Sequence, residues 1–130
     1  MQALNNRNRV LLIEDDARLR SVLARTIRRR GHEVIEAESA TEAREALESN
    51  HIRAAVIDVN LPDGTGWDIV RWVRSHCDPA PKLIVISAAG FPLSRVRDYQ
   101  PDATLNKPFP IDALIQHLER PDAGESGEPR

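Results

Sequence analysis

Residues 9–16 read RVLLIEDD, a short apolar run that ends directly in three acidic residues. Apolar runs of this length without alternation are typical of strands buried on both faces of a parallel sheet. Three further apolar runs end directly at a polar residue, namely Asp58, Ser87 and Lys107. The carboxyl ends of parallel strands meet at one edge of the sheet, where open α/β sheets bind ligands. The sequence therefore predicts one site that combines carboxylate, hydroxyl and ammonium groups.

Amphipathic segments separate the apolar runs. We expect strands over 9–13, 33–37, 54–57, 83–86 and 103–106, with helical patterns over 17–30, 40–49, 69–73, 92–99 and from 111. Ser39 is expected to cap the second helix, with Glu42 three residues later as in a capping box. Five strands that alternate with helices predict a parallel sheet covered on both faces, with right-handed crossovers.

The composition is that of one ordinary globular domain. The chain has 130 residues, of which 41% are hydrophobic and 29% are charged, and its net charge is -2. This length suits a single hydrophobic core rather than two. No apolar run approaches the roughly 20 residues that a membrane-spanning helix needs, so we expect no membrane contact. No basic stripe interleaves with aromatic residues, so we expect no direct contact with nucleic acid.

The ends of the chain and its cysteine bear on location and organisation. Residues 1–7 lack the apolar core of a signal peptide, and Cys77 has no partner for an internal disulfide, so both features favour the cytoplasm. We expect an N-terminal extension over 1–8, one domain over 9–120 and a disordered tail over 121–130, which is rich in Gly, Pro, Ser and acids. With this organisation, we expect no effector domain within these residues.

Three acids follow the first predicted strand, where a phosphate-binding βα fold would place glycines. Carboxylates would repel an anion there, but they suit a hard divalent cation such as Mg²⁺, or Mn²⁺ in its place. Acids at a helix N-terminus also complement the helix dipole, and we expect Asp16 to do only that. Glu14 and Asp15 lie at a strand end opposite Asp58, so we predict that these three carboxylates form a metal site.

Asp58, Ser87 and Lys107 each have an ordinary structural interpretation. An aspartate after a strand is most often a turn residue, and a serine there is most often a helix cap. Lys107 is more informative because the chain has 16 arginines and only two lysines. A compact ammonium can pair with a carboxylate and then with a phosphoryl oxygen, without the bidentate geometry of a guanidinium. Together the three residues favour a magnesium-dependent aspartyl phosphorylation site.

Over roughly residues 8–120 the chain resembles the receiver domain of two-component response regulators. Five landmarks agree in kind, order and spacing: Glu14-Asp15, the acceptor Asp58, the loop Pro62 with Gly66, Ser87-Ala88, and Lys107-Pro108-Phe109. The resemblance implies a flavodoxin-like, doubly wound (βα)5 fold, which is a three-layer α/β sandwich with parallel strand order 2-1-3-4-5. It also implies a stand-alone protein, similar to the chemotaxis regulators, that acts as a signalling switch and not as an enzyme.

The resemblance assigns roles to the acidic residues. Asp58 would be the phosphoacceptor. Asp15 and Asp58 would supply carboxylate ligands to Mg²⁺, Asn60 would supply its backbone carbonyl, and Glu14 would act through bound water. Asn60 and Ala89 lie two residues after the acceptor and after the hydroxyl, where they flank the path of the hydrolytic water. Because Ala89 cannot orient that water, we expect the phosphoryl group to be lost slowly.

Other residues would take part in the response to phosphorylation. By the same resemblance, Lys107 would neutralise phosphoryl charge and Ser87 would hydrogen-bond a phosphoryl oxygen. Three residues before the lysine, many receivers carry an aromatic that swings inward on activation, but this chain has Thr104. We therefore expect Ser87 and the backbone of residues 88–104 to transmit the signal, since that segment has the weakest helical pattern.

The resemblance also implies partners. The phosphodonor would be a sensor histidine kinase or a histidine phosphotransfer protein, and the output would be contact with a downstream protein, made by a monomer or a phosphorylation-dependent dimer. Two alternatives stay open. One is a phosphorelay intermediate that passes its phosphoryl group to another histidine, and the other is a non-phosphorylated pseudo-receiver used as a binding module.

Overall fold

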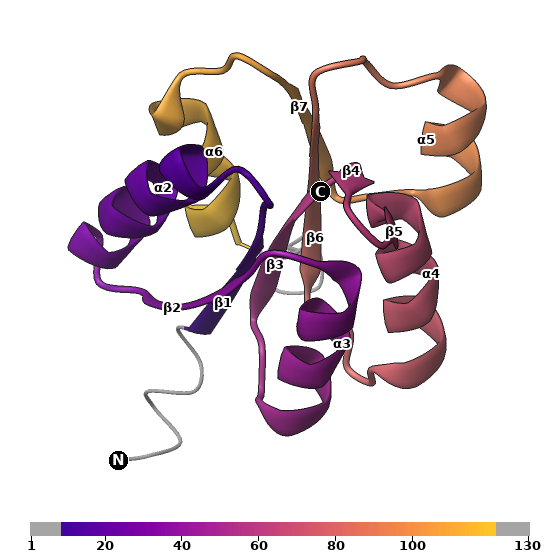
Figure 1. Ribbon diagram of the computed structural model, residues 1–130, viewed down its shortest axis with the longest axis horizontal. Helices are drawn as coiled ribbons and strands as arrows, with labels where there is room; N and C mark the ends of the chain where they lie inside the picture. The colour runs from indigo at the N-terminus through magenta and orange to yellow at the C-terminus, as the bar shows by residue number, and fades with distance from the viewer. Residues whose placement is uncertain (1–8, 122–130) are drawn as a thin grey trace, which may run out of the picture.

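Five parallel strands form the central sheet of the computed structural model, which describes residues 9–121 (Figure 1). The strands are β1 Arg9–Ile13, β2 Glu33–Ala37, β3 Ala54–Asp58, β6 Lys82–Ser87 and β7 Ala103–Asn106. Their order is β2-β1-β3-β6-β7, which confirms the predicted order 2-1-3-4-5 for the five main strands. The predicted extension over 1–8 and all of the predicted tail after its first residue lie outside the described residues.

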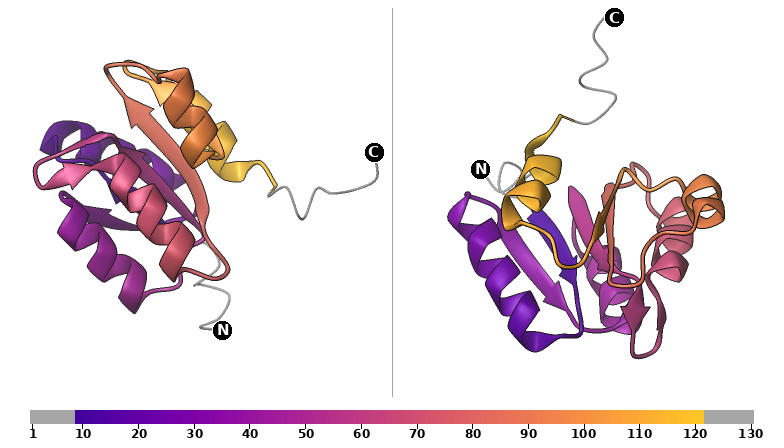
Figure 2. Two further views of the ribbon diagram at one scale, coloured as in Figure 1. Left: turned by 90° about the vertical axis from the view of Figure 1, so that its right-hand side faces the viewer. Right: turned by 90° about the horizontal axis from the view of Figure 1, so that it is seen from above.

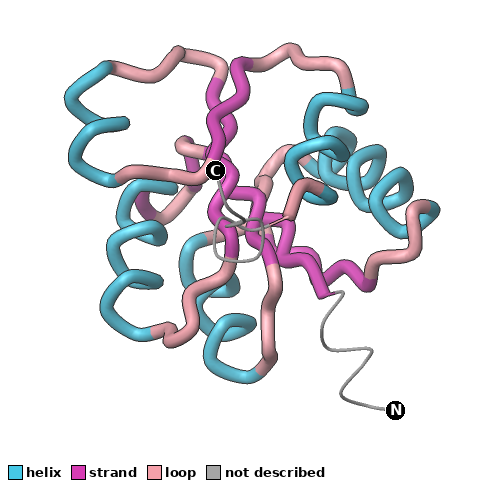
Figure 3. The backbone as a smooth tube through the Cα atoms, turned by 180° about the vertical axis from the view of Figure 1, so that it is seen from behind, coloured by secondary structure: helices cyan, strands magenta, loops and turns pink. Residues whose placement is uncertain are grey.

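Helices cover both faces of this sheet and make three layers (Figures 1 and 2). The helices are α2 Ala17–Arg29, α3 Ala40–Ser49, α4 Gly66–His76, α5 Leu93–Tyr99 and α6 Ile111–Glu119. Helices α2 and α6 cover one face of the sheet, and α3, α4 and α5 lie on the other. Figure 3 shows both helix layers, with the strands between them, from behind the view of Figure 1. Over residues 9–121, no helix combines the length and the apolar character needed to cross a membrane.

Each face of the sheet has its own apolar core, because successive strand residues point to opposite faces. Leu12 and Val56 pack with residues of α2 and α6, whereas Leu11 and Leu83 pack with residues of α3 and α4. All five residues of β3 are buried. A strand covered on both faces favours apolar side chains along its length, which explains the continuous apolar runs; in β3 the polar residue, Asp58, comes last.

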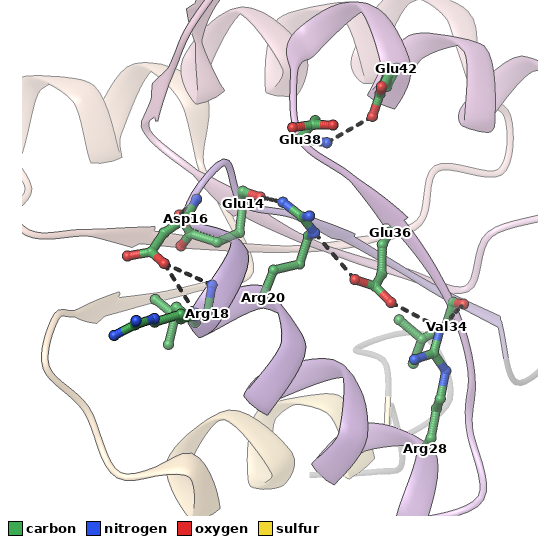
Figure 4. Close-up of polar contacts among 10 residues, drawn as sticks. Glu14, Asp16, Arg18, Arg20, Arg28, Val34, Glu36, Glu38 and Glu42 are labelled. Carbon is green, nitrogen blue, oxygen red and sulfur yellow. Dashed lines mark hydrogen bonds and ion pairs between the residues drawn. The ribbon is translucent and has the colours of Figure 1, made fainter.

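The helix ends follow local chemistry. The side-chain oxygen of Ser39 accepts a hydrogen bond from the Glu42 backbone N–H at 3.1 Å, which confirms the predicted cap of α3. The predicted capping box is wrong in its second half, because the Glu42 carboxylate accepts from the Glu38 N–H at 2.9 Å and not from Ser39 (Figure 4). A reciprocal capping box does occur at α4, between Thr65 and Asp68.

The segment between Asp58 and α4 contains structure that the sequence did not indicate. Strands β4 (Asn60–Leu61) and β5 (Gly64–Thr65) pair antiparallel and form a short hairpin. We expected only a loop there, because two residues per strand are too few to show an alternating pattern.

Candidate functional site

The carboxyl ends of β1, β3, β6 and β7 bring four polar groups to one edge of the sheet. Glu14 follows β1, Asp58 ends β3, Ser87 ends β6 and Lys107 follows β7. The Lys107 ammonium lies 2.9 Å from Glu14 Oε1 and 3.0 Å from Asp58 Oδ2. The residues that the sequence placed at one edge therefore do meet there, and Lys107 bridges two carboxylates from different strands.

Three acidic side chains at this edge are grouped closely enough to share a cation. Carboxylate oxygens of Glu14, Asp15 and Asp58 all lie within 4.8 Å of one another. Glu14 and Asp58 are buried, whereas Asp15 is exposed to solvent. Glu14 Oε1 is buried, and its ion pair with the Lys107 ammonium is not a well-aligned hydrogen bond. Carboxylate oxygens grouped in this way, with one of the side chains open to solvent, fit a hard cation such as Mg²⁺.

Burial and charge shift the pKa values of this cluster. Burial raises the pKa of Glu14 from 4.5 to about 7, against the opposing effect of Lys107. Burial alone would lower the pKa of Lys107, but its contacts with the Glu14 and Asp58 carboxylates raise that pKa above its ordinary value. Lys107 is therefore a permanent positive charge beside Asp58 at neutral pH.

The backbone that follows β1 is fixed by α2. The Arg20 guanidinium donates to the Glu14 carbonyl at 2.7 Å and to the Glu36 carboxylate at 3.2 Å (Figure 4). Asp16 Oδ1 accepts from the N–H groups of Arg18 and Leu19, so Asp16 is the N-cap of α2, in agreement with its predicted structural role. Arg20 was not predicted, because its contact with the site runs through a backbone carbonyl and leaves no pattern in the sequence.

The chain that follows Asp58 holds that residue in place. The Asn60 N–H donates to Asp58 Oδ1 at 3.1 Å, while Lys107 donates to Oδ2. A Cβ atom at Gly66 would lie 2.4 Å from the Asp58 carbonyl oxygen, and the Gly66 N–H donates to the Val59 carbonyl at 2.7 Å. Only glycine allows α4 to begin this close to the end of β3.

Ser87, Ala89 and Thr104 belong to the two strands beyond β3 and to the loop between them: Ser87 ends β6, Ala89 follows it and Thr104 lies in β7. The Ser87 hydroxyl is buried and accepts from the Ala89 N–H at 3.0 Å, while the Ser87 carbonyl accepts from the Lys107 N–H at 2.9 Å. Ala89 is exposed and its methyl group offers no hydrogen bond. Thr104 pairs with Val85 in the interior of β7 and is half-buried. Thr104 therefore lies within β7, three residues before Lys107, whereas Ser87 lies at the carboxyl end of β6.

Comparison with known proteins bears on this geometry. Residues 10–119 match the response regulator receiver domain. The chain belongs to that family. It is 31% identical over 120 residues to the transcriptional regulatory protein GltR of Pseudomonas aeruginosa, and the match covers 88% of this chain and 48% of GltR. It is 34% identical over 112 residues to the transcriptional regulatory protein PhoP of Escherichia coli, which covers 85% of this chain and 50% of PhoP.

Solved receivers share the fold. The non-phosphorylated HemR receiver domain of Leptospira biflexa is 26% identical, with a TM-score of 0.77, and the match covers 88% of this chain and 98% of that one. The chemotaxis regulator CheY4 of Vibrio cholerae has a TM-score of 0.79 at 24% identity, covering 86% and 96%, which shows a shared fold. The resemblance drawn from the five landmarks is thus confirmed.

Membership fixes the function at a coarse level. The chain carries a receiver domain of two-component signalling, and such domains are switches that bind Mg²⁺ at an acidic pocket. Receivers are generally not enzymes. The chain spans about half the length of the curated relatives that it matches.

Proposed function

We propose that this receiver accepts a phosphoryl group from a phosphohistidine onto Asp58 and signals through protein contacts that depend on phosphorylation. The observation that carries the proposal is the contact of Lys107 with both Asp58 and Glu14, beside an exposed Asp15. A carboxylate that is flanked by a fixed ammonium, and by further carboxylates that can hold a divalent cation, is arranged to accept a dianionic group once the cation is bound.

The transfer needs positioning and charge neutralisation more than covalent chemistry from other groups. A carboxylate oxygen of Asp58 forms a bond to phosphorus as the bond from phosphorus to the histidine nitrogen breaks, and the imidazole keeps that electron pair. Asn60 N–H and Lys107 hold one oxygen of Asp58 each, which fixes the orientation of the carboxylate. Mg²⁺, held by Asp15, Asp58 and the Asn60 carbonyl with Glu14 acting through water, would offset the charge of the phosphoryl oxygens.

The response would pass through Ser87 to residues 88–104. Helix α5 in this segment has no buried residues, and its Leu93 is 66% exposed. Aromatic contacts join the segment to α4: the Trp67 ring centroid lies 6.3 Å from that of Phe91 and 5.1 Å from that of Tyr99. An element held by few buried contacts has low local stability, so a small displacement of Ser87 toward a phosphoryl oxygen can move it.

Intact-mass analysis tests the chemistry. The protein is incubated with acetyl phosphate, with Mg²⁺ or with a chelator, and is compared with Asp58→Asn. The expected result is a gain of one phosphoryl group that requires Mg²⁺ and is absent in the variant. No gain by the wild type from acetyl phosphate or from a phosphohistidine donor would favour the pseudo-receiver alternative.

The donor and the output of the whole protein are further proposals. Family membership implies a histidine kinase as the partner, and a histidine phosphotransfer protein would make the chain a phosphorelay intermediate. Loss of the phosphoryl group to a phosphotransfer protein, and its gain there, would identify the relay. The two curated relatives are named transcriptional regulators, so control of transcription is a second candidate output, to which this receiver would contribute by protein contact.

A further inference from the structure

A short hairpin carries the proposed carbonyl ligand of the metal. Asn60, in β4, pairs with Thr65 in β5, and Pro62 and Asp63 form the turn between the strands (Figure 1). Isolated two-stranded hairpins are marginal in water, and this one has only two residues per strand. Contacts with the rest of the protein must therefore hold Asn60 in place.

The base of this hairpin is fixed by α4. Thr65 Oγ1 accepts from the Asp68 N–H at 3.2 Å, and the Asp68 carboxylate accepts from the Thr65 N–H at 3.4 Å. Gly66 closes the same junction through its hydrogen bond to Val59. These contacts fix β5, but none of them holds the turn of the hairpin.

The turn is fixed by a different helix. The Asp63 carboxylate accepts from the Ala40 N–H at 2.7 Å, the Thr41 N–H at 3.0 Å and the Thr41 hydroxyl at 2.7 Å, all at the first turn of α3. These bonds hold the pKa of Asp63 well below 3.8, at about 2, so the carboxylate is ionised across the physiological range. Helix α3 already has its own N-cap, the Ser39 side chain. Asp63 is thus a second acceptor, supplied by the hairpin.

We propose that Asp63 is a positioning residue for the metal site, which ties the turn of the hairpin to α3 and so holds the Asn60 carbonyl in place for the cation. The inference rests on the proposed function, because it assigns a role to that carbonyl. With the turn released, the hairpin is held at its base alone, and binding of the cation must then order it at a cost in affinity.

Matched variants separate positioning from simple helix capping. Asp63→Ala removes the tether and its bonds to α3, whereas Ser39→Ala removes a cap of the same helix and leaves the hairpin tethered. Mg²⁺ affinity is measured by isothermal titration calorimetry, and the Asn60 amide is followed by NMR. We expect Asp63→Ala to raise the Mg²⁺ dissociation constant about 3- to 10-fold, below the about 10- to 100-fold typical of direct partners of metal ligands. Ser39→Ala should leave the constant unchanged.

Two further variants guard against a failure to fold. Asp63→Asn keeps an acceptor but loses the charge, and Thr41→Val removes one of the three bonds. Both should raise the dissociation constant less than Asp63→Ala and more than Ser39→Ala. The inference would be overturned if Asp63→Ala and Ser39→Ala had the same Mg²⁺ dissociation constant, whether that constant equals the wild-type value or differs from it.

The two proposals fail in different ways. A wild type that is phosphorylated, with variants of equal Mg²⁺ affinity, rejects the role of Asp63 alone. A wild type that binds Mg²⁺ but takes up no phosphoryl group from either donor rejects the proposed function, and the ratio of affinities still tests the tether. A wild type that binds no Mg²⁺ rejects both.

Discussion

Replacement of Lys107 by methionine should destabilise the metal-free protein and make its stability depend on Mg²⁺. Lys107 is the counter-ion of two buried carboxylates, at 2.9 Å from Glu14 and 3.0 Å from Asp58. Methionine keeps an apolar stem of similar length but removes the charge. Glu14 and Asp58 would then face each other at the edge of the sheet without an ammonium between them.

The contacts set the magnitude. Each pair at that separation attracts by about 5 kcal/mol at an effective dielectric constant of about 20. Desolvation of the charges cancels much of this attraction, and removal of one partner from a buried pair costs about 3–5 kcal/mol. The Lys107 side chain is 21% exposed, so solvent screens part of the interaction. We expect the free energy of unfolding to fall by about 2–4 kcal/mol at neutral pH without Mg²⁺.

The pH dependence has a definite sign. The pKa of Glu14 is raised from 4.5 to about 7, so its protonation stabilises the folded, metal-free protein fully below pH 4.5, and this contribution is lost as the pH rises through 7. As the pH falls below 7, the Glu14 carboxyl becomes neutral, and its electrostatic interaction with Lys107 becomes weaker. The cost of Lys107→Met should therefore be smaller at about pH 5 than at neutral pH.

The assay is urea unfolding followed by tryptophan fluorescence, with chelator or with saturating Mg²⁺. A cation at the acidic cluster replaces the missing charge, so Mg²⁺ should restore most of the stability lost in Lys107→Met. Lys82 is the matched control, because it donates to the carbonyls of His117 and Arg120 at the end of α6. The cost of Lys82→Met should not change with Mg²⁺. Equal stability of Lys107→Met and wild type in chelator at neutral pH would refute the reasoning.

Three other predictions address lifetime, the hairpin and the switch. Ala89→Glu should lose its phosphoryl group faster than wild type, because a carboxylate can orient the hydrolytic water; mass analysis over time checks this, and an equal or slower loss in the variant contradicts it. Asp63 should stabilise the fold above pH 3.8, and this contribution should vanish as the pH falls through about 2, so the advantage of wild type over Asp63→Asn in unfolding experiments should shrink across that range. In a Trp72→Phe background, beryllofluoride with Mg²⁺ should change the fluorescence of Trp67, because its ring contacts the aromatics of residues 91–99; an unchanged spectrum, or unchanged amide shifts over 88–104, would contradict transmission through that segment.

The fold was largely predictable because each main strand and helix carries its own local pattern. Buried strands show as apolar runs, and the structure ends the run of β3 at Asp58 itself. Even the short helix α5 was expected, over 92–99 against the observed Leu93–Tyr99. The meeting of Glu14, Asp58 and Lys107 was predictable for the same reason, since parallel strands bring their carboxyl ends to one edge.

The features that the sequence did not predict depend on contacts between segments that share no repeating pattern of apolar residues. Asp63 and Thr41 are 22 residues apart in the chain, and neither stands out beside a strand or on a helix face. The binding of Arg20 to the Glu14 carbonyl uses no side chain of the site. The Glu42 carboxylate accepts from the Glu38 N–H instead of completing a capping box, a choice that the local sequence does not determine.

The contacts divide the edge of the sheet into a fixed side and a side whose helix is held at its surface. On the fixed side, the ion pairs of Lys107 join the end of β7 to the ends of β1 and β3. Gly66 lets α4 begin close to Asp58, and Asp63 binds the hairpin to α3. On the other side, α5 buries none of its residues and is joined to α4 by exposed hydrogen bonds, from Arg71 to the Tyr99 hydroxyl and from Arg74 to the Tyr99 and Gln100 carbonyls. Under the proposed function, phosphorylation adds charge at Asp58. The fixed side, which carries the metal site, keeps its geometry, so we expect the conformational change to occur in residues 88–104. The absence of an aromatic at Thr104 does not remove this route, because Trp67 already joins the segment to α4 through Phe91 and Tyr99.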